Sequence, residues 1–112
     1  MRTLAPLGFE ARKALQAIAA GLRQARLRRR DTIAVAAARV GVSASTWQRL
    51  ESGDESVAWG IVMSALMVYG FERQVFALGS PAADEQGQIL EAKLLPKRGR
   101  RRKAAGAQEK EK

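Results

Sequence analysis

The sequence predicts an all-α fold built as one small domain. No segment alternates apolar and polar residues with a period of two, whereas apolar residues recur at intervals of three and four in several stretches. Glycine or proline residues separate these stretches, as expected where short helices end. At 112 residues the chain has room for one domain with a modest core.

The first predicted helix runs from Phe9 to about Arg29. Leu15, Ile18 and Leu22 are spaced as one face of a helix, with alanine residues between them. The opposite face is basic, and the closing sequence RLRRR suits the negative end of the helix dipole. This helix is therefore expected to offer one face to the core and one to an anionic partner.

A second helix is predicted from Ile33 to about Val40. Asp31 or Thr32 can cap its start, because both residue types accept a hydrogen bond from the first turn. Gly41 ends it, since glycine takes a left-handed conformation at little cost.

The third predicted helix follows directly and ends near Ser52. Either Ser43 or Ser45 can cap it, and Ser45 has the spacing of a capping box. Trp47 and Leu50 lie three residues apart and are expected to face inward.

One longer helix and two short ones complete the prediction. The helix over residues 58–69 is apolar on several faces, which predicts a central position. A fifth helix covers residues 71–78, and after the loop GSPAAD a last short helix reaches about Leu95. The residues that the fifth helix is expected to add to the core are Val75, Phe76 and Leu78.

Positive charge is concentrated at the two ends of the chain. Residues 1–30 carry a net charge of +7, residues 31–95 of −4 and residues 96–112 of +6. The total of +9 and the isoelectric point near 11.1 indicate a polyanionic partner, with nucleic acid as the first candidate and an anionic membrane surface as the second.

The composition argues against an enzyme, a metal site or a bound cofactor. Cysteine and histidine are both absent, which removes disulfides, the usual zinc ligands and the commonest general base. Acidic neighbours such as Asp54 and Glu55 are interpreted as caps and solvated charges. Neither a long apolar run nor the apolar core of a secretory signal occurs, so we expect a soluble cytoplasmic protein without a membrane partner.

The stretch ARVGVSASTWQRLESGD carries the functional signal. It has the layout helix, glycine turn, helix, and the small Ala37 lies four residues before Gly41, which allows the two helices to cross closely. The second of them buries one side and presents short polar groups and one long donor, as a helix that reads the DNA major groove does. The residues on the presenting side are Ala44, Ser45, Gln48 and Arg49.

AARVGVSASTWQRLESGD resembles the Xre or Cro/CI-type helix-turn-helix, whose pattern reads LAxxxGVSxxTIxxIExG, and the likeness covers about residues 22–78. It implies a five-helix bundle with a short C-terminal helix and a basic disordered tail. The expected divisions are an N-terminal segment (1–8), a DNA-binding domain (9–79), a linker with a short helix (80–95) and a basic flexible tail (96–112).

The resemblance also implies roles for single residues. Ala44, Ser45 and Arg49 take base-facing positions, Gln48 contacts a base or the backbone, and Trp47 replaces a buried Ile. Outside this motif Arg49 would be an ordinary solvated residue paired with a nearby acid. The expected DNA phosphate contacts are Thr32, Ser43, Thr46, Arg28, Arg29, Arg30, Lys97, Arg98, Arg100, Arg101 and Arg102.

The chain departs from the family pattern at two positions of the second helix. Ile33 stands where the family usually has Gln, which removes a customary phosphate anchor, and Ala36 stands where it has Leu, which lightens the core. Other residues leave alternatives open. Trp59 is a core edge or a subunit contact, methionines of the fourth helix pack in the core or line an interface, and Glu51 pairs with an arginine such as Arg39.

Three segments, LRQARLRRRD, LESGDESVAWGIVMSALMVYGF and AKLLPKRGRRRK, are together similar to HipB-like antitoxins. That similarity implies a homodimer that binds a palindromic operator in its own promoter and holds a HipA-like serine/threonine kinase toxin inactive in the bacterial cytoplasm. A stand-alone phage or plasmid repressor is the alternative. A toxin-binding protein with incidental DNA contact is a third reading, motivated by Ile33.

Overall fold

The computed structural model describes residues 5–94, and every regular element in that range is helical. The prediction of an all-α fold is therefore confirmed. The chain divides after Val75 into two compact units. The elements in order are α1 (Phe9–Arg28), α2 (Ile33–Val40), α3 (Ala44–Glu51), α4 (Trp59–Val68), α5 (Glu72–Ala77), a 3₁₀ turn (Pro81–Ala83) and α6 (Glu85–Leu94).

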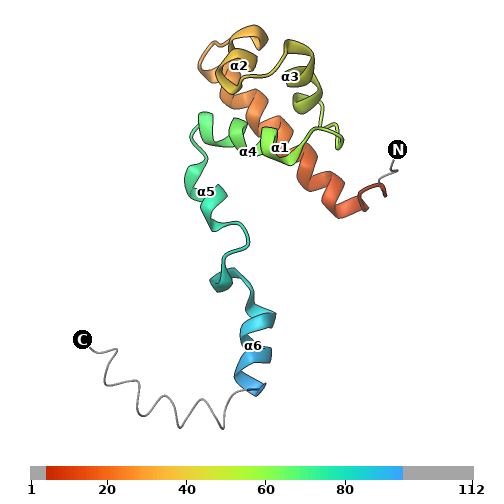
Figure 1. Ribbon diagram of the computed structural model, residues 1–112, viewed down its shortest axis with the longest axis vertical. Coiled ribbons are helices and arrows are strands. Elements are labelled where there is room, and N and C mark those ends of the chain that lie inside the picture. The colour runs from red at the N-terminus through yellow and green to blue at the C-terminus, as the bar shows by residue number, and fades with distance from the viewer. Residues whose placement is uncertain (1–4, 95–112) are drawn as a thin grey trace, which may run out of the picture. The chain divides into compact units, whose positions relative to one another are not determined.

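The core of the first unit forms where α1, α2, α3 and α4 meet. Its largest fully buried side chains are Leu22, Trp47 and Leu50, and helical spacing predicted all three. Ala36 and Ala37 are also buried, so α2 lies close to α3. Figure 1 shows α2, α3 and α4 gathered around the C-terminal half of α1.

The end of α1 has an unusual residue in a left-handed conformation. Arg30 has φ 58°, its N–H donates to the carbonyl of Leu27 (2.9 Å), and the N–H of Asp31 donates to the carbonyl of Arg26 (3.1 Å). This is the hydrogen-bond pattern that commonly closes a helix, and glycine usually holds the left-handed position. At the ends of α2, α3 and α4 that position is held by Gly41, Gly53 and Gly70.

A polar cluster ties the start of α2 to the end of α4. The Tyr69 hydroxyl donates to Asp31 Oδ2 (2.7 Å), and Arg39 Nε lies 3.0 Å from the same oxygen. The guanidinium of Arg29 lies over the Tyr69 ring, 5.4 Å from its centroid. Burial and the bond to Asp31 raise the pKa of Tyr69 to about 12, and the Tyr69 hydroxyl lowers the pKa of Asp31.

Two predictions about apolar residues are wrong. Val75 is buried, but Phe76 is 76% exposed and Leu78 is 58% exposed, so neither of these two adds to the core. Successive residues on a helix point about 100° apart, so the neighbour of an inward-facing residue on a short helix turns away. Ile33, which stands where the family usually has Gln, is partly buried and packs against the core of the first unit.

The second unit begins at Phe76, and its described part contains the end of α5, the 3₁₀ turn and α6. Gln88 Nε2 donates to the carbonyl of Pro81 (2.9 Å), and the Asp84 carboxylate accepts the N–H of Gly87 (2.9 Å), which holds the turn against the start of α6. The apolar residues of α6 are exposed. Over residues 5–94 no helix has the length and hydropathy of a membrane span.

Candidate nucleic-acid interface

The turn between α2 and α3 is built around one glycine. Gly41 has φ 83°, and the N–H groups of Gly41 and Val42 both donate to the carbonyl of Ala37, at 2.8 and 2.9 Å. These bonds close α2 and redirect the chain, so that α3 begins three residues after the glycine. The predicted glycine break is confirmed.

Hydroxyl side chains cap both helices of this motif. Thr32 Oγ1 accepts the N–H of Val35 (3.1 Å) at the start of α2, and Ser43 Oγ accepts the N–H of Thr46 (3.1 Å) at the start of α3. Ser43 Oγ also lies 3.0 Å from Thr46 Oγ1 and donates to it. Of the alternatives left open by the sequence, Thr32 and Ser43 are therefore the caps, and Ser45 is not.

The inner side of α3 is fastened to α1 by a buried ion pair. Arg26 donates through Nε to Glu51 Oε2 (2.6 Å) and through Nη2 to Glu51 Oε1 (3.1 Å). Trp47 Nε1 donates to the same Oε2 (2.6 Å), and Arg26 Nη1 donates to the carbonyl of Asp31 (3.0 Å). Arg26 is only 7% exposed, and its hydrogen bond with Glu51 raises its pKa.

The expected pairing of Glu51 with an arginine is confirmed, but the partner is Arg26 and not Arg39, the example given. Arg39 binds Asp31 instead, because α1 crosses α3 at Arg26 and brings that guanidinium to Glu51 first. The expected burial of Trp47 is confirmed, since its ring is fully buried and lies 5.9 Å from the ring of Tyr69. Within residues 5–94 no buried side-chain nitrogen or oxygen lacks a hydrogen-bond partner.

The outer side of α3 carries all four residues predicted to face bases. Their side chains are exposed, and they occupy successive turns of the helix on the side away from Trp47 and Leu50. Three of them are short or uncharged and one is the long donor Arg49. The four residues are Ala44, Ser45, Gln48 and Arg49.

Arg49 is held by residues that follow α3. Its Nε donates to Asp54 Oδ2 (3.1 Å) and its Nη2 donates to Ser56 Oγ (2.9 Å). One interpretation of the sequence paired Arg49 with a nearby acid, and the structure contains such a pair with Asp54. Its side chain is 44% exposed, which leaves part of the guanidinium open to solvent.

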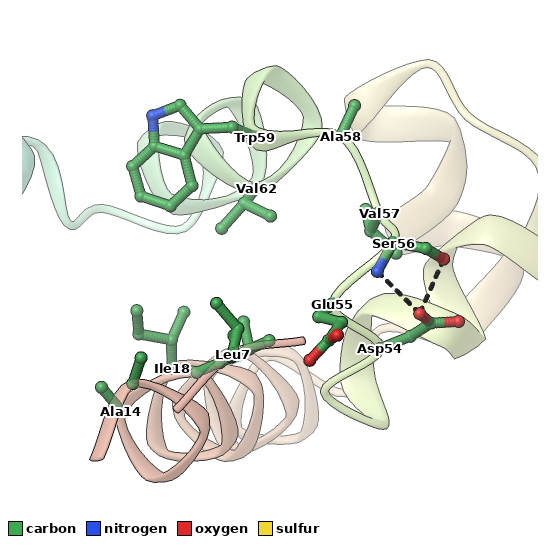
Figure 2. Close-up of a pocket in the computed structure, with 12 residues that line it drawn as sticks. Leu7, Ala14, Ile18, Asp54, Glu55, Ser56, Val57, Ala58, Trp59 and Val62 are labelled. Carbon is green, nitrogen blue, oxygen red and sulfur yellow. Dashed lines mark hydrogen bonds between the residues drawn. The ribbon is translucent and has the colours of Figure 1, made fainter. Parts of the chain in front are cut away.

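Asp54 is itself fixed by the turn in which it lies. Its Oδ1 accepts the N–H of Ser56 (2.8 Å) and the Ser56 hydroxyl (2.7 Å), as Figure 2 shows. The two bonds from Ser56, followed by the bond from Arg49, lower the pKa of Asp54 to about 2. We missed this cluster in the sequence, although Asp followed two residues later by Ser is a known turn signal.

The arginine run at the end of α1 divides by its contacts. Arg29 Nη1 donates to the carbonyl of Ala25 (2.9 Å), whereas Arg28 and Arg30 are exposed and make no side-chain hydrogen bond or ion pair with a residue in the described range. The basic residues predicted for the tail lie outside the described residues. These are Lys97, Arg98, Arg100, Arg101 and Arg102.

A second candidate site is an apolar pocket of about 530 Å³ between α1, α4 and the loop after α3. Figure 2 shows Leu7, Ala14 and Ile18 on one side, facing Trp59 and Val62 across the opening. Trp59 is 56% exposed at the opening of this pocket, which is compatible with both the core-edge and the subunit-contact interpretation. No group of three acidic residues in the described range could hold a metal ion.

Comparison with known families identifies a helix-turn-helix domain. Residues 17–78, more than half of the 112-residue chain, match the model of an Xre-like helix-turn-helix domain. The matched range contains α2, the glycine turn, α3 and the residues that hold Arg49. No curated protein and no solved structure gave a significant match.

Proposed function

The chain belongs to the helix-turn-helix domain family, and from this premise we propose that it is a dimeric repressor that reads one DNA sequence. DNA binding follows from the family, whose domain is typical of non-enzymatic regulators. The observation that carries the proposal is the division of α3. Its inner side is locked to α1 through Glu51, and its outer side exposes the residues predicted to face bases.

In the proposed complex α3 lies in the major groove. Arg49 is matched to guanine, whose O6 and N7 both accept from the guanidinium, and Gln48 is matched to adenine, whose N7 accepts from the amide NH₂ and whose N6 donates to the amide oxygen. Ala44 suits contact with a thymine methyl group, and Ser45 can bond to more than one base. Two such helices in a dimer would read half-sites about one helical turn apart.

Phosphate contacts are proposed for the ends of the helices. The hydroxyls of Thr32 and Ser43 lie at the N-termini of α2 and α3, where free N–H groups and the helix dipole favour an anion. Ile33 packs partly against the core and has no group that could hydrogen-bond to a phosphate, so the proposal assigns further phosphate contacts to the basic flanks. The remaining proposed contacts are Thr46, Arg28, Arg29, Arg30, Lys97, Arg98, Arg100, Arg101 and Arg102.

The experiment begins with full-length protein and a pool of random DNA duplexes, from which the preferred sequence is selected. Replacing Arg49 with Ala is expected to weaken binding to the selected duplex by about 1–3 kcal/mol and to relax selectivity at one base pair. Fluorescence anisotropy on the selected and a random duplex measures both. An equal loss on the two duplexes would show that Arg49 does not read a base.

Arg23→Ala is the matched control for this experiment. Arg23 is an exposed arginine of α1 with no side-chain hydrogen bond or ion pair inside the described region, so its loss removes the same charge without touching α3. Circular dichroism of both variants reports the fold, because Arg49 also contacts Asp54.

The finer proposal is that this repressor is a HipB-like antitoxin that neutralises a HipA-like serine/threonine kinase toxin in the bacterial cytoplasm. It is supported by the three sequence segments similar to such antitoxins, whereas the family match reaches only the helix-turn-helix level. A neighbouring kinase gene whose product co-elutes with this chain would support it. A repressor with no such neighbour would favour the stand-alone alternative.

Nanomolar binding of such a kinase by a chain that protects no operator in a footprint would instead favour the third reading, a toxin-binding protein.

A further inference from the structure

The guanidinium of Arg49 is held along one edge. Nε donates to Asp54 Oδ2 and Nη2 donates to Ser56 Oγ, so the edge that joins these two nitrogens is occupied. A guanidinium carries five N–H bonds in a fixed plane. The opposite end, formed by Nη1 and the second N–H of Nη2, still presents two parallel donors.

That open end has the geometry that guanine requires. The O6 and N7 atoms of guanine lie side by side on the major-groove edge and accept a pair of parallel N–H bonds. Holding the Nε side of the guanidinium therefore leaves the guanine-reading pair available and orients its plane. An arginine with no such support would have to lose the freedom of its long side chain on binding.

We propose that Asp54 and Ser56 are positioning residues that set the base specificity of Arg49. This inference rests on the proposed function, because it assumes that α3 enters the major groove. The residues act through Arg49 and need touch no base themselves. Their role is to keep the side chain in one orientation before DNA arrives.

The support for Arg49 is built into the backbone around it. The N–H of Asp54 donates to the carbonyl of Arg49 (3.1 Å), which closes α3, and the Ser56 N–H fixes the carboxylate of Asp54. Val57, the next residue, is buried and anchors the turn in the core. An exposed ion pair adds little to stability, so orientation is the effect to be expected of this one.

The test uses Asp54→Asn in the full chain and the DNA duplex selected by the unchanged protein. Asparagine keeps an acceptor for both bonds from Ser56, but its NH₂ group replaces Oδ2 and cannot accept from Arg49. We expect discrimination at the base pair that Arg49 reads to fall about 10-fold, part of the range that one arginine–guanine pair supplies. Ser56→Ala should produce a smaller loss at the same base pair.

Glu55→Gln is the matched control. It removes the same negative charge one residue away, where Glu55 pairs with Arg12 and not with Arg49. Both variants should bind all DNA somewhat more tightly, because each loses a charge that repels phosphate. Only Asp54→Asn should lose selectivity, and adding it to Arg49→Ala should cause no further loss of selectivity.

Three outcomes would decide the matter. Unchanged discrimination in a folded Asp54→Asn protein would overturn the proposal, with folding checked by circular dichroism and Tm. Tighter binding than Glu55→Gln with discrimination intact would also overturn it, and would show that Asp54 withholds Arg49 from DNA. A chain that selects no preferred sequence at all would contradict the proposed function rather than the positioning.

Discussion

The two sides of α3 carry the same chemical pair in opposite surroundings. On the inner side Arg26 Nε lies 2.6 Å from a Glu51 oxygen, with side chains that are 8% and 9% exposed. On the outer side Arg49 Nε lies 3.1 Å from an Asp54 oxygen, with side chains that are 44% and 34% exposed. The two pairs join the same kinds of group and differ in burial. The buried pair Arg26–Glu51 fixes the helix, whereas a ligand can approach the exposed pair Arg49–Asp54.

The physical reason is the solvent around each pair. Water and salt screen the outer pair, and its donors remain partly open to a partner. The inner pair has lost its water, so each of its charges depends on the other. A helix held in this way can present the partly exposed Arg49 to a ligand while the helix itself stays fixed.

The largest effect that tests this comparison is expected from Glu51→Ala. The substitution leaves the charge of Arg26 buried without its partner and removes the acceptor of Trp47 Nε1, so the free energy of unfolding should fall by about 3–5 kcal/mol. Urea denaturation measures the loss. Glu55→Ala is the control, because it breaks the exposed pair with Arg12 and should cost far less. Equal losses in the two variants would contradict the distinction.

A smaller effect is expected in acid. The pKa of Asp54 is about 2 in the folded chain against an ordinary 3.8, so its contribution to stability is complete above about pH 4 and is lost as the pH falls toward 2. The Tm of the unchanged protein should therefore fall over this range, and part of that fall should be missing in Asp54→Asn. If Tm changed with pH in the same way in the two proteins, the cluster of Arg49, Asp54 and Ser56 would contribute nothing to stability. Asp31, whose pKa is also lowered, contributes in the same direction in both proteins.

The smallest effect concerns Arg28 and Arg30, whose side chains have no hydrogen-bond or ion-pair partner among residues 5–94. Arg28→Ala and Arg30→Ala should each reduce the slope of log affinity against log salt by about 0.9 if each side chain contacts one phosphate. Titration of a random duplex at several salt concentrations measures the slope, with Arg23→Ala as the control. Deleting residues 97–112 tests the tail in the same way, and an unchanged slope would assign the tail to another partner.

The local features of the motif were predictable because they depend on neighbours in sequence. Helical spacing indicated Trp47 and Leu50 as core, and the left-handed turn at Gly41 followed from residue type. The interpretation of Asp54 as a cap or solvated charge accounts for its hydrogen bond with the Ser56 N–H. It does not account for the ion pair between Asp54 and Arg49.

The errors concern contacts between elements. The partner of Glu51 depends on where α1 crosses α3, and the sequence alone does not show that Arg26 rather than Arg39 reaches it. Phe76 is as apolar as any core residue, and only the orientation of α5 shows that it faces outward. Crossing points and helix rotation are set by packing over the whole unit, which one short window of sequence does not contain.

The closing residue of α1 has a consequence for protein engineering. Three helices of the first unit place glycine in the left-handed position, whereas α1 places Arg30 there at a conformational cost of about 1 kcal/mol. A library selected for thermal tolerance alone should accept glycine at position 30, whereas one selected for DNA binding should keep a basic residue if Arg30 contacts a phosphate. A single substitution at this position would then exchange DNA affinity for stability.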